Sequence, residues 1–275
     1  MPELPEVEVS RLGLLPHLTG RTLVRAVFRA AKLRHALTPE LASRLAGKRI
    51  RVILRRGKYL LFGCAGGEDE GWLILHLGMS GSLRLVSPDA PAQKHDHVDL
   101  VFPETILRLR DPRRFGTLLW QEGPDVERHP ALAALGLEPL SPGFDGDWLY
   151  AATRHRNTPI KPLLMDGRLL VGIGNIYASE ALFRAGIAPA RAAGRIGLER
   201  CRRLAGAIRA TLEAAIAAGG SSVRDYVHSD GGAGSFQVAC AVYGRAGQPC
   251  RICGTPIRAL RQAGRTSFHC PRCQK

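Results

Sequence analysis

The sequence predicts an α+β protein with an N-terminal β-sandwich, a helical C-terminal domain and a small cysteine-bearing β-hairpin at the end. Three observations predict this arrangement: short strand-like runs between residues 20 and 120, helical periodicity after residue 149, and two Cys-x2-Cys pairs near the C-terminus. The chain has 275 residues, 45% of them hydrophobic, which is enough for two compact cores and an appendage.

The N-terminal part begins with a short helical pattern near Pro5 and continues as a series of strands separated by turns. The spacing of these strands is typical of a β-sandwich or a barrel. The predicted strands are Thr22–Arg29, Arg49–Arg55, Tyr59–Phe62, Trp72–Leu77, Leu83–Val86, Val98–Phe102, Ile106–Arg110 and Thr117–Trp120.

The C-terminal part reads as helical. Helices are predicted at Ile160–Met165, Ile176–Ala185 and Leu198–Ala218, the last with an apolar stripe along one face. Residues 122–148 are rich in Pro, Gly and Asp, which indicates a linker on the surface. We therefore expect an N-terminal domain at 1–121, a linker at 122–148, a helical domain at 149–234 and a tail at 235–275.

The tail carries a predicted zinc site. Cys250-x2-Cys253 and Cys270-x2-Cys273 are separated by 16 residues, the spacing of a tetrahedral four-thiolate site. Such a closed set predicts one structural Zn²⁺ rather than a catalytic ion. Disulfides or free thiols are the alternative. The other cysteines, Cys64, Cys201 and Cys240, are predicted to be buried small apolar residues.

The charge of the chain indicates a polyanionic partner. The formal net charge is +15, and residues 21–60 hold twelve Lys or Arg against one acid, Glu40. Nucleic acid is the first candidate; a merely solvated surface or a membrane surface is the alternative. Since no apolar run reaches about 18 residues and the N-terminus is acidic, we expect a cytoplasmic, nucleoid-associated protein without membrane contact.

Six motifs in this order, followed by the cysteine pairs, make the sequence resemble the formamidopyrimidine-DNA glycosylase family along nearly its whole length. They are Pro2-Glu-Leu-Pro-Glu6, Gly57-Lys58-Tyr59, His76-Leu-Gly-Met79-Ser-Gly, Lys94-His95-Asp96-His97, Asp111-Pro-Arg-Arg-Phe-Gly116 and Gly172-Ile-Gly-Asn175-Ile-Tyr-Ala-Ser-Glu180. The resemblance implies a helix-two-turns-helix module in the helical domain and a zinc finger in the tail.

The N-terminus offers a chemical reason, independent of the resemblance, to expect a DNA glycosylase. If Met1 is removed, Pro2 exposes a secondary amine, and with a pKa near 7.8 about one in seven such groups is unprotonated at pH 7. This amine can attack C1′ of a deoxyribose, and Glu3 beside it can move protons. The alternative is that Pro2 and Glu3 simply start a helix.

The resemblance also implies roles for residues that composition alone leaves as turn, core or surface positions. Lys58 and Arg265 would contact phosphates and assist β- and δ-elimination respectively. Met79, Arg113 and Phe115 would fill the gap left by an everted nucleotide. The remaining DNA contacts would be His76, His95, Arg156, Asn157, Lys161 and Asn175, with Asn175 as a helix cap; Arg156-Asn157 departs from a more lysine-rich family pattern. Gly219–Ser235 would be a lid over the everted base.

The resemblance implies a monomeric, bifunctional DNA glycosylase and AP lyase acting on oxidised purines in damaged double-stranded DNA. It would need one Zn²⁺ and no organic cofactor. Two alternatives stay open. One is an endonuclease VIII-type glycosylase for oxidised pyrimidines, and the other is a zinc-finger protein that binds DNA without catalysis.

Overall fold

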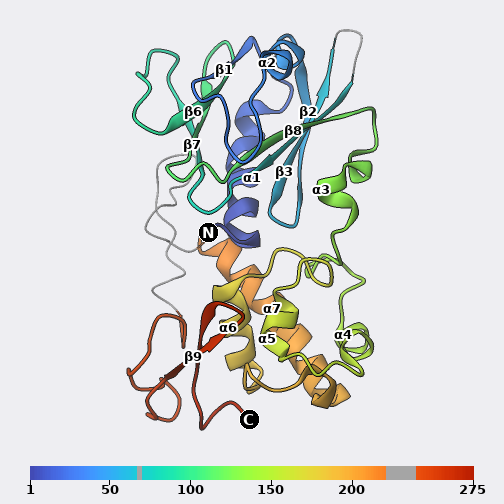
Figure 1. Cartoon of the computed structure of the whole chain (residues 1–275), viewed down its shortest axis with the longest axis vertical. Coiled ribbons are helices and arrows are strands. Elements are labelled where there is room, and N and C mark those ends of the chain that lie inside the picture. The colour runs from blue at the N-terminus through green and yellow to red at the C-terminus, as the bar shows by residue number, and fades with distance from the viewer. Residues whose placement is uncertain (67–69, 221–239) are drawn as a thin grey trace. The chain divides into compact units, whose positions relative to one another are not determined.

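A computed structural model describes residues 1–66, 70–220 and 240–275, and these form two compact units (Figure 1). The first unit contains residues 1–133 and 218–220, and the second contains residues 134–217 and 240–275. Most of the lid predicted at Gly219–Ser235 lies outside the described residues. None of the helices in the described ranges combines the length and the apolar character needed to cross a bilayer.

The first unit starts with helix α1 (Leu4–Leu18), whose first turn is set by local sequence. Glu3 is the N-cap, Pro5 lies in the first turn, and the Glu6 carboxylate accepts the backbone N–H of Glu3 at 2.7 Å. One face of the helix, including Val7 and Leu14, is buried in the core of the unit. The first residues of the chain are therefore held beside a packed helix.

Two antiparallel four-stranded sheets share that core, which confirms the predicted β-sandwich. One sheet has the order β1-β6-β7-β5 and the other β2-β3-β4-β8. Their strands are β1 (Arg25–Phe28), β2 (Arg49–Arg56), β3 (Tyr59–Ala65), β4 (Gly71–His76), β5 (Ser82–Val86), β6 (Asp96–Val101), β7 (Ile106–Arg110) and β8 (Thr117–Glu122). Residues of both sheets, such as Leu60 and Leu107, contribute to the one core.

Short elements complete the first unit. Helix α2 (Pro39–Leu45) begins at Thr38, whose hydroxyl accepts the N–H of Leu41 at 3.3 Å. A 3-10 turn, η1 (Val126–Arg128), and helix α3 (Pro130–Ala133) follow β8. The predicted strand Thr22–Arg29 is shorter than expected because Thr22 makes only an isolated bridge, with Arg49.

The second unit joins helices to a β-hairpin. Its elements are α4 (Gly146–Thr153), α5 (Ile160–Leu164), α6 (Asn175–Arg184), η2 (Ala193–Arg195), α7 (Leu198–Ala217), β9 (Arg258–Gln262) and β10 (Arg265–His269). Helix α7 packs against α4 and α6 through the predicted stripe, in which Leu204, Ile208 and Leu212 are buried. Helix α4 starts inside the span 122–148, where Asp145 accepts the N–H of Trp148 at 2.7 Å.

A buried carboxylate ties the tail to the helices within the second unit. Glu180 on α6, 2% exposed, accepts the backbone N–H groups of Ala241, Val242 and Tyr243 at 2.8, 2.9 and 2.8 Å. Bonds from backbone donors to an ionised carboxylate are among the stronger hydrogen bonds in proteins. The chain entering the hairpin is thus anchored to the helix that begins at Asn175.

Candidate active site and nucleic-acid interface

The N-terminal segment borders a cleft of the first unit. Met1 lines this cleft, whose volume is about 580 Å³, together with His76, Met79 and Phe115. Pro2 and Glu3, the next two residues of the chain, are buried. In the structure the Pro2 nitrogen is joined to Met1 and is an amide, so removal of Met1 would both create the secondary amine and open the cleft toward it.

Lys58 lies in the tight turn between β2 and β3, as predicted, and two neighbours define this turn. Gly57 has a φ of 56°, which a residue with a Cβ rarely adopts. Arg55 donates to the Gly57 carbonyl at 3.0 Å and to the Glu8 carboxylate of α1 at 2.9 Å. The Lys58 turn is therefore tied to the helix that follows Pro2 and Glu3.

Glu8, the carboxylate that accepts the hydrogen bond from Arg55, is ionised. Burial alone raises the pKa of its carboxyl, but the hydrogen bonds and charges of Arg11 and Arg55 outweigh burial and bring the pKa below its ordinary value. Arg11 lies on the same helix face, 2.6 Å from Glu8. At neutral pH the Glu8–Arg55 pair is fully charged.

His76, at the end of β4, lines the cleft as a neutral imidazole. Burial, and then the charges of Lys58 and Arg34, lower its pKa to about 4. Its Nδ1 accepts the N–H of Gly78 at 2.9 Å, which leaves the proton on Nε2. His76 can thus donate one hydrogen bond to an anion across the neutral pH range.

Met79, Arg113 and Phe115 gather on two adjacent loops. The side chains of Met79 and Phe115 are 40% and 43% exposed, although residues of these types are usually buried. The Arg113 guanidinium carbon lies 4.8 Å from the centre of the Phe115 ring. Two exposed apolar groups beside a stacked cation could enter a base stack and face an unpaired base.

His95 and Arg34 lie next to these loops. His95 has a φ of 76°, and its carbonyl accepts the N–H of Asp111, the first residue of the second loop, at 2.9 Å. Arg34, which the sequence analysis did not single out, lines the cleft, and its backbone N–H donates to the Gly116 carbonyl at 3.0 Å. The only signal for Arg34 in the sequence was the cation-rich run 21–60, in which it is one of twelve.

A second cleft, of about 210 Å³, lies within the second unit between the helices and the hairpin. Lys161, Asn175 and Arg265 line it, as does Ser267, which was not predicted. The Lys161 ammonium donates to Asn175 Oδ1 at 2.6 Å and to Ser267 Oγ at 2.9 Å. Arg265 and the N-terminal end of α6 suit this cleft to a phosphate, whereas Lys161 is 1% exposed and bonded to protein acceptors.

The expected role of Asn175 as the helix cap is wrong. Gly174 is the N-cap of α6, and Asn175 is the first helical residue. Its side chain instead bridges Lys161 and the carbonyl of Thr266, to which Nδ2 donates at 3.0 Å. The amide therefore joins the helix start to the hairpin rather than capping the helix.

Arg156 and Asn157 are exposed in the loop after α4. Arg156 Nε donates to the carbonyl of Ala152 at 2.9 Å, on the last turn of that helix. Within the described ranges, the residues lining the second cleft do not include this pair. Their predicted contact with the DNA backbone stays a prediction.

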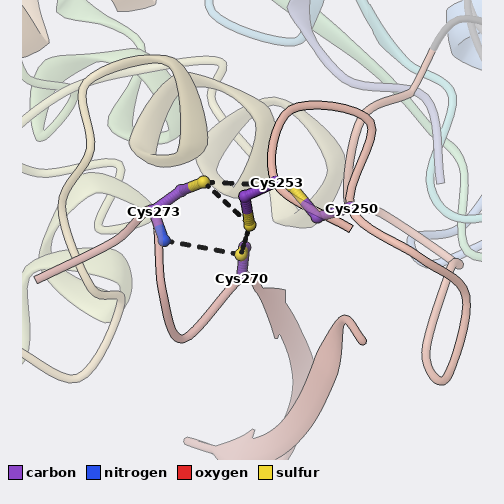
Figure 2. Close-up of side chains that lie close together, drawn as sticks. All are labelled: Cys250, Cys253, Cys270 and Cys273. Atoms are coloured by element: carbon purple, nitrogen blue, oxygen red, sulfur yellow. Dashed lines mark hydrogen bonds between the residues drawn. The ribbon is translucent and has the colours of Figure 1, made fainter. Parts of the chain in front are cut away.

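The four tail cysteines converge as a metal site requires (Figure 2). Their sulfur atoms all lie within 4.8 Å of one another, with Cys253 and Cys270 at 3.5 Å and Cys250 and Cys273 at 3.9 Å. Tetrahedral Zn²⁺ with bonds of about 2.3 Å would place its thiolates about 3.8 Å apart, so the residues fit one structural zinc ion.

The remaining three cysteines lie outside the metal site, and the structure confirms the prediction that they are buried. Cys64, Cys201 and Cys240 are buried, and burial raises the pKa of the Cys64 thiol to about 11. In the part of the chain that the structure describes, the four-cysteine group is the one cluster of Cys, His and acidic side chains close enough to hold a metal.

Family models match three segments of the chain, and the two larger ones are formamidopyrimidine-DNA glycosylase domains. Family models match at residues 1–118 (formamidopyrimidine-DNA glycosylase N-terminal domain), 135–227 (formamidopyrimidine-DNA glycosylase H2TH domain) and 247–275 (zinc finger found in FPG and IleRS).

Individual relatives match over their full length. The chain is 58% identical to the formamidopyrimidine-DNA glycosylase of Dechloromonas aromatica and 54% identical to that of Ralstonia nicotianae, with 100% of both chains covered in each case. Among solved structures it resembles a Lactococcus lactis FPG mutant in complex with DNA containing Fapy-dG (TM-score 0.91, 36% identity, 100% of both chains). It also resembles the MutM (FPG) protein from Thermus thermophilus (TM-score 0.87, 41% identity, 99% of this chain and 98% of the other).

Proposed function

The chain belongs to the formamidopyrimidine-DNA glycosylase family, and we propose on that basis that it is the base excision repair glycosylase that removes oxidised purines from duplex DNA. The observation that carries the proposal is the cleft of the first unit, where Met1, ahead of Pro2 and Glu3, lies beside the exposed side chains of Met79 and Phe115. A nucleophile and a wedge on one cleft are what excision of a base from a stack requires.

In the glycosylase step, the Pro2 nitrogen forms a bond to C1′ as the bond between C1′ and the base breaks. The electron pair of the broken bond leaves with the base, which takes up the proton that the Pro2 nitrogen loses. Glu3 protonates the sugar ring oxygen, the ring opens, and the product is a Schiff base between Pro2 and the sugar. Lys58 and His76 hold the phosphate beside the lesion as cation and neutral donor.

The proposal extends to a lyase activity. Loss of a proton from C2′ of the Schiff base expels the 3′ phosphate (β-elimination), and a second proton loss expels the 5′ phosphate (δ-elimination), leaving a one-nucleotide gap. We assign Lys58 to the first step and Arg265 to the second, on the family resemblance. Arg265 lines the phosphate-sized cleft of the second unit, which supports a phosphate contact.

We further propose that the enzyme acts as a monomer in the cytoplasm, at the nucleoid, with no organic cofactor. Its DNA backbone contacts include Lys161, Asn175 and His95, with Arg156 and Asn157 as additional contacts from the loop after α4. Related solved structures are complexes of Lactococcus lactis Fpg with Fapy-dG DNA and with abasic-site DNA, which supports damaged duplex DNA as the partner here. The endonuclease VIII alternative is not favoured, since the family models match formamidopyrimidine-DNA glycosylase over both large segments.

The test is covalent trapping with borohydride on a duplex that contains 8-oxoguanine, using protein whose N-terminus has been checked by intact mass. Protein that starts at Pro2 should give a trapped adduct and excise the base. Protein that retains Met1, and the Pro2→Gly variant, should still bind an abasic-site duplex but lose at least about 100-fold in excision rate, the scale of a lost catalytic group.

One result would establish the non-catalytic alternative. If protein starting at Pro2 binds the 8-oxoguanine duplex and a duplex with an oxidised pyrimidine, yet forms no adduct and releases no base from either, the chain is a DNA-binding protein and the proposed mechanism is wrong.

A further inference from the structure

A buried hydrogen-bond network joins the two loops that carry Met79, Arg113 and Phe115, the residues proposed to act as a wedge and called the wedge residues below. The hydroxyl of Ser80 donates to Asp111 Oδ1 at 2.7 Å, and the backbone N–H of Gly116 donates to Asp111 Oδ2 at 2.7 Å. Ser80 Oγ in turn accepts the backbone N–H of Arg113 at 3.1 Å. Asp111 is 0% and Ser80 4% exposed, so these bonds are shielded from water.

The network brackets each wedge residue. Ser80 directly follows Met79, its oxygen holds the backbone of Arg113, and Asp111 holds the residue directly after Phe115. The three side chains therefore extend from backbone positions that are all fixed by one carboxylate and one hydroxyl.

The loops are also locked by backbone contact. Gly78 has a φ of +65°, and a Cβ at that position would lie 2.4 Å from the carbonyl carbon of Phe115. A Cβ at Gly81 would lie 2.2 Å from the carbonyl oxygen of Leu77. Gly78 therefore packs directly against the backbone of the second loop, and Gly81 closes the first loop on itself through a hydrogen bond of 2.9 Å to Leu77.

The residues that form the network are buried, whereas the side chains that it positions are exposed. Ser80 and Asp111 are inaccessible, whereas Met79 and Phe115 are 40% and 43% exposed. A side chain can push into a base stack only if its own backbone does not yield, because unstacking a nucleotide costs a few kcal/mol. The exposed side chains of Met79 and Phe115 therefore need the rigid backbone that the buried Ser80 and Asp111 provide.

We propose that Ser80 and Asp111 are positioning residues for base eversion: they hold Met79, Arg113 and Phe115 in the geometry that displaces the damaged nucleotide. This inference rests on the proposed function, since it assumes that these three side chains act as the wedge. The pair lies outside the chemical steps, so its loss slows excision of a stacked base more than it slows cleavage at a site that has lost its base.

The hydroxyl is the component that can be removed with the smallest change in volume. Ser80→Ala deletes the donor to Asp111 and the acceptor for Arg113, leaving a buried carboxylate oxygen and a part-buried N–H without their partner. Asp111 keeps the bond from Gly116, so the second loop stays attached at its far end. The expected effect is a loosened wedge on a folded protein.

The experiment compares single-turnover rates on two duplexes that differ only at the target, one with 8-oxoguanine opposite cytosine and one with an abasic site. Ser80→Ala should lower the rate about tenfold on the 8-oxoguanine duplex and less than about twofold on the abasic duplex. A 2-aminopurine next to the lesion reports unstacking directly, and its fluorescence rise on binding should be slowed by the same factor as excision.

Ser82→Ala is the matched control, because Ser82 is equally buried, at 2% exposed, and lies two residues away at the start of β5. It should leave both rates at the wild-type value. Ser80→Thr, which keeps the hydroxyl, should restore excision. If Ser80→Ala fails to fold, Ser80→Cys tests the same point, since a thiol of similar size is a weaker donor and acceptor.

Each outcome decides the matter. Equal losses on both duplexes, or no loss on either, would overturn the positioning role while leaving the proposed function intact. A wild-type protein that cleaves neither duplex would overturn the proposed function itself, and this inference with it.

Discussion

Individual residues of the first cleft show how strongly the folded environment sets chemical behaviour. His76 would be about half protonated near pH 6.5 in an unfolded chain, but in the fold burial and the charges of Lys58 and Arg34 lower its pKa to about 4. The residue type alone suggested a group that switches near neutrality. The structure makes it a constant hydrogen-bond donor.

This shift predicts a loss of stability in acid. Below pH 6.5 the unfolded state binds the His76 proton and the folded state does not, so the free energy of unfolding falls as the pH drops toward 4. His76→Gln should abolish about 1–3 kcal/mol of that fall, measured by urea unfolding from pH 7 to pH 4. Since burial also lowers the pKa of His97, His129 and His269, only the difference between variant and wild type isolates His76. Parallel curves for the two proteins would contradict the prediction.

At the same scale, the sequence identified ligands better than it identified exposed residues. The zinc cysteines followed from spacing, because four thiolates at that separation have few other uses in such a chain. Met79 and Phe115 could not be recognised as exposed from residue type, since a methionine or phenylalanine is usually buried; only the family resemblance singled them out. Ser80 stands in one of the family motifs, but neither it nor Ser267 was given a role, because their contacts join segments that are distant in sequence.

Among the elements, the turn between β2 and β3 depends most clearly on a long-range pairing. Arg55, whose side chain is 11% exposed, connects Glu8 on α1 with the carbonyl of Gly57, one residue before Lys58. Removing the guanidinium leaves a partly buried carboxylate without one of its partners and frees the turn.

Arg55→Met should therefore lower the free energy of unfolding by about 2 kcal/mol at pH 7 and reduce lesion excision through misplacement of Lys58. Because the folded pKa of Glu8 lies below its ordinary value, this deficit is fully present above the ordinary pKa and disappears as the pH falls through the lowered one. Arg51→Met on the same strand is the control: its pair with Glu70 is half exposed on both sides, and it should cost about 0.5 kcal/mol or less. Urea unfolding of both variants at pH 7 and pH 3 measures the difference. A deficit in Arg55→Met that persists unchanged in acid would show that Glu8 is not the partner that matters.

Helices and strands could be predicted from the sequence only where local residue patterns mark them. Strands β2, β5 and β7 were predicted within one residue of their observed bounds because alternation and turn residues mark them locally. Helices α2 and α4 were missed although Thr38-Pro39 and Asp145 mark their starts, because each is short and lies in a segment that otherwise reads as loop. The strand order of the two sheets depends on pairing between distant segments, which local patterns do not encode.

At the level of the whole molecule, we expect the zinc site to support DNA binding indirectly. The hairpin that the four cysteines close also carries Ser267 and the Thr266 carbonyl, which hold Lys161 and Asn175 of the helical part in place. A tail with so few buried apolar residues depends on its metal to fold. Loss of zinc should therefore disorder the phosphate cleft of the second unit.

Removing zinc with a tight chelator should weaken binding to an abasic-site duplex by at least about tenfold, equivalent to about 1.4 kcal/mol, while the strand signal of the first unit in circular dichroism stays unchanged. Fluorescence anisotropy measures the affinity, and added Zn²⁺ should restore it. Cys253→Ala should reproduce the loss, whereas Cys201→Ala, a buried thiol on α7 outside the cluster, should retain both zinc and affinity. Undiminished affinity after complete zinc removal would separate the finger from DNA binding.

The cleft lined by Lys161, Asn175 and Arg265 has a practical consequence for the choice of assay buffer. If its donors bind the DNA backbone as proposed, a free inorganic phosphate or sulfate would compete for them, because it presents the same oxygens. Buffers made from these salts would occupy the place that the duplex must take, beyond their effect on ionic strength. Rates measured in them and in organic buffers of equal ionic strength are therefore not interchangeable.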